Sequence, residues 1–145
     1  MEDAAAMDEV VIDSEWSGTT AGGCPNYATW TNNPTFVLAR KAKTSRAVVT
    51  ITLSQAPQPD GTIYPIGVLV LKLDKLTPKT KLTNAMMLAQ IQCSREQSVT
   101  TGEIELNVPA KGLLVVPLTF EPGKEASFRL TLQQPADAPL SLARP

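Results

Sequence analysis

The chain has 145 residues, with 13 basic and 14 acidic side chains, two cysteines and no histidine. This length predicts one domain that buries its own core without disulfides or bound metal. The missing histidine excludes a Cys-His thiol-protease centre, and two distant cysteines without an imidazole exclude an ordinary zinc site.

Charge and composition divide the chain into three parts. Six of the acids and none of the bases precede Trp16, so residues 16–145 carry 13 bases against eight acids. We expect residues 1–14 to be a flexible acidic leader, residues 15–134 to be the folded domain, and the Pro/Ala-rich residues 135–145 to be a tail. The leader lacks the order of a signal peptide and no apolar run reaches the roughly 18 residues of a membrane span, which predicts an intracellular, cytoplasmic protein with reduced thiols.

Residues 15–36, EWSGTTAGGCPNYATWTNNPTF, predict a compact loop, which we call the glycine loop. Its two adjacent glycines accept positive φ or close backbone approach, and the proline two residues later fixes φ. Its three large rings are expected to bury and anchor it. The glycines match neither phosphate-binding pattern, and Cys24 suits a tight backbone better than a nucleophile. The candidate structural and interface residues are Trp16, Gly22, Gly23, Cys24, Asn26, Tyr27 and Trp30.

The rest of the domain consists of short apolar segments separated by turn residues. Residues 47–53 and 102–108 alternate apolar and polar side chains, as half-buried strands do, whereas residues 66–73 are almost continuously apolar, which predicts a central strand. Residues 84–93 contain good helix formers, and we interpret them as strand from context. Pro117 predicts an edge or a bulge, because proline cannot donate to a sheet. The expected strands are Phe36–Lys41, Ala47–Leu53, Ile66–Leu73, Asn84–Cys93, Gly102–Val108, Leu113–Phe120 and Ser127–Leu132.

Strands at a spacing of about ten residues are typical of an antiparallel β-sandwich, so the expected fold class is all-β with about eight strands. Two separated motifs carry a family resemblance. The first is W-x3-T-A-G-G-C-x-N-Y from Trp16, followed by W and N-P-x-F, and the second is GLLVVPLTFEPGKEASF at residues 112–128. Both resemble domain III of calpains. The resemblance implies a C2-like sandwich of two four-stranded sheets, noncatalytic and located beside a cysteine protease core.

The resemblance also raises a calcium role, since domain III of calpains commonly carries an acidic loop between its second and third strands. Here the corresponding residues 39–47, ARKAKTSRA, contain four bases and no carboxylate. A hard cation takes about six to eight oxygen ligands, several of them carboxylate. Glu103 and Glu105, which share a strand face, are better interpreted as solvated side chains than as an enclosed site. We therefore expect no calcium, metal or other cofactor and no catalytic residues.

The bases of the domain gather in two loops and leave the kind of partner open. The first hypothesis is docking on a calpain-like protease core or another protein, with the glycine loop in the contact surface. The alternative is a peripheral membrane module that binds anionic phospholipid through the basic loops, each base contributing about 1 kcal/mol. The candidate residues are Arg40, Lys41, Lys43, Arg46, Lys72, Lys75, Lys79 and Lys81.

The two hypotheses differ in whether the basic residues of 40–46 and 72–81 share one face, because a membrane needs a single surface. Either loop by itself is also compatible with a solvated strand end. Nucleic-acid binding is disfavoured, because the sequence lacks exposed aromatic residues interleaved with the bases.

Overall fold

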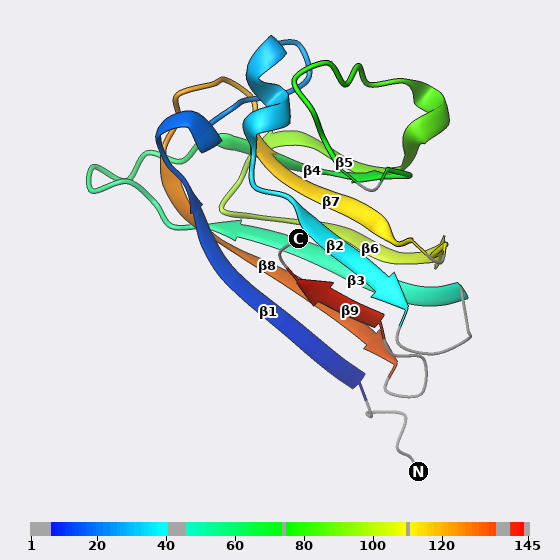
Figure 1. The fold of residues 1–145 in the computed structure, drawn as a ribbon. Coiled ribbons are helices and arrows are strands. Elements are labelled where there is room, and N and C mark those ends of the chain that lie inside the picture. The colour runs from blue at the N-terminus through cyan, green and yellow to red at the C-terminus, as the bar shows by residue number, and fades with distance from the viewer. Residues whose placement is uncertain (1–6, 41–45, 74, 110, 136–139, 144–145) are drawn as a thin grey trace.

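The computed structural model describes residues 7–40, 46–73, 75–109, 111–135 and 140–143. Within these residues nine strands form two antiparallel sheets that pack face to face, with strand orders β1-β8-β3-β6 and β5-β4-β7-β2-β9 (Figure 1). The all-β sandwich predicted from the sequence is confirmed. The strands are β1 Met7–Trp16, β2 Phe36–Arg40, β3 Arg46–Gln55, β4 Pro65–Leu71, β5 Met87–Arg95, β6 Ser98–Asn107, β7 Leu113–Thr119, β8 Ala126–Pro135 and β9 Leu140–Ala143.

In the described residues, helical structure is limited to short 3₁₀ turns at Gly18–Thr20, Ala28–Asn32 and Asn84–Met86. Across the part of the chain that the structure describes, no helix has the length and apolar character that crossing a membrane requires. The segment 84–93, whose composition favours helix, follows its propensity only over the first three residues and then continues as β5. Two register shifts against β4 place extra residues in β5, so this edge strand is bulged.

The first strand lies where the sequence suggested a flexible leader. Residues 7–14 form most of β1, which pairs with β8 along its whole length from Met7↔Pro135 to Trp16↔Ala126. Val10 and Ile12 are partly buried against the core, while Glu9 and Asp13 are exposed, which is the period of two of a half-buried strand. The structure therefore differs from the leader expectation over residues 7–14, because a short apolar alternation suffices when a partner strand covers it.

A second difference concerns the expected tail. Residues 140–143 form β9, which pairs with β2 and extends its sheet to five strands instead of the expected four. Leu140 and Leu142 are buried in the core. The buried side chain of Gln134 fixes the return of the chain, since its Nε2 donates to the Leu140 carbonyl at 2.9 Å and its Oε1 accepts from the Leu140 N–H at 2.7 Å.

Pro117 lies in a central strand, where the sequence predicted an edge or a bulge. Its strand β7 has β4 on one side and β2 on the other, but the pairing with β2 reaches only Phe36↔Val115. Pro117 therefore stands beyond the end of β2 and needs no donor on that side. Its carbonyl oxygen instead accepts a hydrogen bond from Trp16 Nε1 at 3.1 Å.

The central strands β4 and β7 of the five-stranded sheet are buried on both faces. The inner face of the sheet contributes to the core between the sheets, while its outer face carries a second apolar cluster that includes Leu69, Leu71, Leu114 and Val116. Two segments cover that outer face: the glycine loop and residues 72–86, which connect β4 to β5 and which we call the lysine loop (Figure 1). We refer to the two loops together as the cap. Coverage on both faces explains why β7 and all but the first residue of β4 are buried.

Candidate functional site

The tight backbone of the glycine loop depends on its two adjacent glycines. A Cβ at Gly22 would overlap the carbonyl oxygen of Thr29. Gly23 has a φ of +80°, and a Cβ there would lie 2.6 Å from the Pro122 nitrogen. The two glycines therefore allow the loop to contact both its own second half and the turn after β7.

Asn33 holds the two halves of the glycine loop together from a buried position. Its Oδ1 accepts from the Gly22 N–H at 3.1 Å, and its Nδ2 donates to the carbonyls of Gly23 at 2.7 Å and Trp30 at 2.9 Å. Thr29 Oγ1 adds a hydrogen bond to the Gly22 carbonyl at 2.7 Å. Asn33 was absent from the candidate residues, although an asparagine beside a proline in a tight loop is a residue type that satisfies nearby backbone groups.

The rings of the glycine loop anchor it in two different places. Trp16 is 1% exposed between the sheets, with its ring centroid 4.5 Å from that of Phe128. Trp30 is 4% exposed and belongs to the second apolar cluster on the five-stranded sheet, where Tyr27 packs against the same cluster and remains partly exposed. The loop is thus fixed from both sides of the sheet, and its shape is set before any partner arrives.

The two cysteines are free thiols that lie in the second apolar cluster. Burial, with a smaller contribution from the neighbouring Cys24, raises the pKa of the Cys93 thiol to about 11. A thiol with this pKa is protonated at pH 7 and does not act as a nucleophile. Cys24 is buried beneath the glycine loop. Both thiols therefore fill space under the cap.

A cavity of about 580 Å³ lies between the glycine loop and the lysine loop. It brings together members of the two candidate sets, since Asn26, Tyr27 and Trp30 come from one and Lys79 and Lys81 from the other. We call it the cap cavity. Its lining residues are Pro25, Asn26, Tyr27, Ala28, Trp30, Pro78, Lys79, Thr80, Lys81 and Leu82.

The other candidate bases that the structure describes do not line the cap cavity. Arg46 opens β3 in the four-stranded sheet, where its Nε lies 3.7 Å from Glu105 Oε2 and 3.4 Å from Asn107 Oδ1. Because β3 runs parallel to β1, its first residue stands at the opposite end of the sandwich from the glycine loop (Figure 1). Lys72 and Lys75 are exposed at the start of the lysine loop and do not line the cavity.

The first basic loop is largely outside the described residues. Lys41 and Lys43 both fall in the range 41–45, and of Arg40 the structure describes only the backbone at the end of β2. The residues that are described do not bring the two basic sets to one surface.

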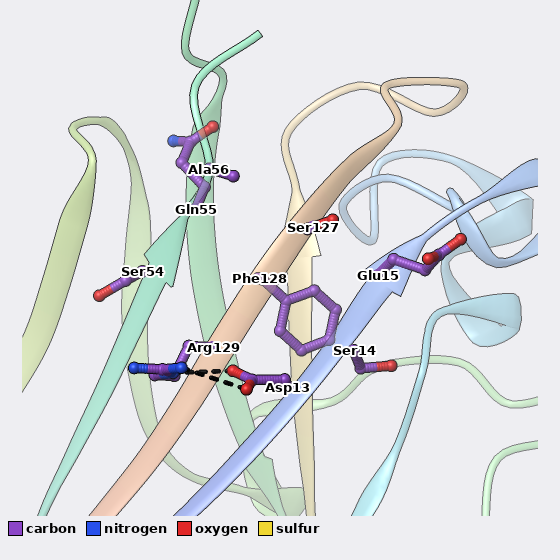
Figure 2. Close-up of a pocket in the computed structure, with 9 residues that line it drawn as sticks. All are labelled: Asp13, Ser14, Glu15, Ser54, Gln55, Ala56, Ser127, Phe128 and Arg129. Atoms are coloured by element: carbon purple, nitrogen blue, oxygen red, sulfur yellow. Dashed lines mark hydrogen bonds and ion pairs between the residues drawn. The ribbon is translucent and has the colours of Figure 1, made fainter.

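A second groove, of about 550 Å³, runs over the four-stranded sheet near the end of β1 (Figure 2). Figure 2 shows Arg129 of β8 reaching across to Asp13 of β1, with Nε to Oδ1 at 2.7 Å and Nη2 to Oδ2 at 3.2 Å. This hydrogen bonding lowers the pKa of Asp13 and raises that of Arg129. The opposite charges neutralise each other, and none of the candidate residues lines this groove. Its lining is Asp13, Ser14, Glu15, Ser54, Gln55, Ala56, Ser127, Phe128 and Arg129.

Metal-binding side chains do not gather in the described ranges, where no group of three or more His, Cys, Asp or Glu residues lies within reach of one ion. Glu103 and Glu105 are both exposed on β6.

The fold is an antiparallel β-sandwich in which two loops cap one face of the five-stranded sheet. Residues 12–132 match the family model of the calpain large subunit, domain III. The chain therefore belongs to this family, a noncatalytic domain of calpain-like cysteine proteases, which confirms the resemblance seen in the sequence.

Individual relatives show the same domain in larger proteins. The chain is 33% identical over 131 residues to the serine/threonine-protein kinase 4 homolog B of Dictyostelium discoideum, covering 83% of this chain and 11% of that protein. It is 30% identical to the calpain-type cysteine protease DEK1 of Arabidopsis thaliana, in a match that covers 83% of this chain and 6% of that protein. It is 29% identical to a putative calpain-like cysteine protease A of Dictyostelium discoideum, in a match that covers 90% of this chain and 20% of that protein. The chain thus spans at most a fifth of the length of these relatives.

Proposed function

We propose that the chain is a regulatory interaction module that docks on a calpain-like catalytic domain or another intracellular protein, without calcium. The observation that carries the proposal is the fixed shape of the glycine loop. Asn33 satisfies its backbone from within, Trp16 and Trp30 hold it on both sides of a sheet, and Asn26 is exposed at its surface. A preformed loop loses little conformational freedom on binding, which favours specific protein contacts.

The range of relatives supports a role in binding. Two of them are named calpain-type or calpain-like cysteine proteases and one is named a protein kinase, yet each shares this domain. Proteolysis and phosphoryl transfer need different catalytic groups. A domain common to both kinds of protein is therefore expected to supply recognition or regulation and not the chemistry.

The charge distribution supports docking without calcium. Residues 39–47 contain no carboxylate, and the described acids of β6 and β1 are spread along exposed strand faces. Calcium needs several oxygen ligands that converge on one point.

The membrane alternative has less support from the geometry. It requires basic residues on one surface, whereas Lys79 and Lys81 line the cap cavity and Arg46 stands at the far end of the other sheet beside Glu105. A bilayer contacts one face of a sandwich at a time, so these bases would not act together. Protein docking at the cap is therefore the function that we propose.

Isothermal titration calorimetry tests the proposal. The purified chain is titrated with a calpain-type catalytic domain from the same organism, once in EDTA and once in 2 mM calcium, and we expect the same Kd in both. Asn26→Ala should weaken binding at least about fivefold, because an exposed interface residue loses its contacts. Asn107→Ala is the matched control, since Asn107 is exposed at the opposite end of the sandwich.

Three outcomes would overturn the proposal: equal Kd values for the two variants, binding that appears only with calcium, or no binding to the catalytic domain while the chain binds anionic vesicles. The last result would establish the membrane alternative.

A further inference from the structure

The cap carries more bases than acids, with Lys72, Lys75, Lys79 and Lys81 against Glu15 and Asp74. Residues 16–35 contain no charged side chain, and residues 75–95 contain three lysines, one arginine and no acid. Among the described residues, ion pairs are formed by Arg46, Lys124 and Arg129, and neither Lys79 nor Lys81 takes part in one. No carboxylate of the described residues therefore pairs with Lys79 or Lys81, and no acid lines the cavity beside them.

The cap cavity combines this charge with an apolar surface. Lys79 and Lys81 are exposed and stand on its lysine-loop side. The remaining lining includes Pro25, Pro78 and Leu82, together with Tyr27 and Trp30. Its volume of about 580 Å³ falls within the roughly 300–1,000 Å³ of pockets that hold ligands of a few residues or one small molecule.

We propose that the cap cavity binds an acidic, extended segment of a protein partner. The inference rests on the proposed function and names the chemistry of the partner at that same surface. Two carboxylates of the segment pair with Lys79 and Lys81, and an apolar side chain between them packs against Pro25, Tyr27 and Leu82. In an extended segment alternate side chains project to the same side. Two carboxylates separated by one residue can therefore face the lysines, while the side chain between them faces the apolar lining.

A polypeptide fits the cavity better than the other polyanions. Trp30 is 4% exposed, so its ring has no open face on which a nucleic-acid base could stack. A bilayer surface is flat, whereas the lysines here line a recess between two loops. Complementary charge also steers association, so binding should weaken with salt over the range where the Debye length shortens.

Fluorescence anisotropy with a defined probe tests the inference. The probe is a fluorescein-labelled peptide of alternating glutamate and leucine, and the control peptide replaces each glutamate with glutamine. We expect the intact chain to bind the acidic peptide at least about tenfold more tightly than the control peptide, with a Kd that rises as salt is raised from about 50 to 300 mM.

Two double variants of equal charge locate the site. Lys79→Gln with Lys81→Gln removes both cavity lysines, and should weaken binding of the acidic peptide at least about fivefold and reduce its salt dependence. Lys72→Gln with Lys75→Gln is the matched control, because it removes the same charge from the same loop outside the cavity; its Kd should stay within about twofold of that of the unaltered chain.

Several results would overturn the inference. They are equal losses in the two double variants, no preference of the intact chain for the acidic peptide, or binding of a single-stranded oligonucleotide or of phosphatidylserine vesicles under conditions in which the peptide does not bind. Calorimetry with the catalytic domain separates this failure from that of the proposed function. Binding that depends on Asn26 but is unchanged in K79Q/K81Q would preserve the docking function and discard the acidic segment.

Discussion

At the residue scale, two positions with the same backbone conformation require glycine for different reasons. Gly23 and Gly123 both have a φ of +80°. A Cβ at Gly23 would meet the Pro122 nitrogen at 2.6 Å, whereas a Cβ at Gly123 has no atom within 4 Å. Gly123 is thus needed for its dihedral angle alone, while Gly23 is needed for its dihedral angle and for the close approach of the turn at residues 121–123.

The comparison of Gly23→Ala with Gly123→Ala separates the two effects. Gly123→Ala should lower the free energy of unfolding by about 1 kcal/mol through the left-handed φ. Gly23→Ala should lower it by more than about 2 kcal/mol, because steric overlap adds to the same dihedral strain. Urea denaturation followed by tryptophan fluorescence measures both. Equal losses would show that the turn at Pro122 moves aside and that contact between the two loops is not rigid.

At the element scale, Trp16 joins the end of β1 to both the core and β7. Its ring packs on Phe128, and its indole N–H meets the carbonyl of Pro117, where β2 no longer pairs with β7. The Trp16 side chain therefore satisfies the Pro117 carbonyl of the five-stranded sheet. Its backbone ends β1 of the four-stranded sheet, where the chain enters the glycine loop. The entry of the cap is fixed at this point.

Substitutions at Trp16 should distinguish burial from hydrogen bonding. Trp16→Ala should lower the free energy of unfolding by roughly 3–5 kcal/mol, because it leaves a large cavity between the sheets. Trp16→Phe keeps an aromatic ring but leaves the Pro117 carbonyl unpaired, and should lower it by about 1–3 kcal/mol. Val11→Ala is the control on the same strand, since Val11 is 43% exposed, and should change stability by less than about 0.5 kcal/mol. A loss for Trp16→Ala no greater than that of the control would contradict the anchoring role.

At the scale of the whole molecule, the two sheets present opposite charge to the solvent. The exposed face of β1 carries Glu9, Asp13 and Glu15, while the cap cavity over the other sheet is lined by Lys79 and Lys81 and by no acid. Asp13 pairs with Arg129 across that face. Neither surface resembles a cage of convergent carboxylates, which is the arrangement that a calcium sensor needs.

Calcium should accordingly leave the thermal stability nearly unchanged. A site of about 1 mM affinity would stabilise the fold in 2 mM calcium by roughly 0.65 kcal/mol, whereas a site of about 10 μM would contribute about 3 kcal/mol. For a domain of this size the stronger site would raise Tm by roughly 6–12 °C. We expect scanning calorimetry in EDTA and in 2 mM calcium to give Tm values within about 3 °C of each other. A calcium-dependent rise of more than about 5 °C would mean that oxygen ligands from separate loops converge.

The sequence by itself determined the strands whose side chains alternate. Ile51, Leu53, Leu130 and Leu132 are buried as their period of two predicts, because strand geometry sends alternate residues to one face whatever the partner strand is. The family motif determined the glycine loop for a similar reason. Positive φ at Gly23 and the burial of large rings are local requirements that few residue types satisfy.

Only the tertiary structure decided which distant segments meet. Residues 7–14 and 140–143 have too little apolar character to predict strands by themselves. The first segment becomes a strand because it pairs with β8, and the second because it pairs with β2. Asn33 and the pairing of Asn26 with Lys79 in one cavity likewise depend on how two loops fold over the same sheet. Local preference acts over a few residues, whereas these contacts follow from sheet order and register, which the whole chain sets together.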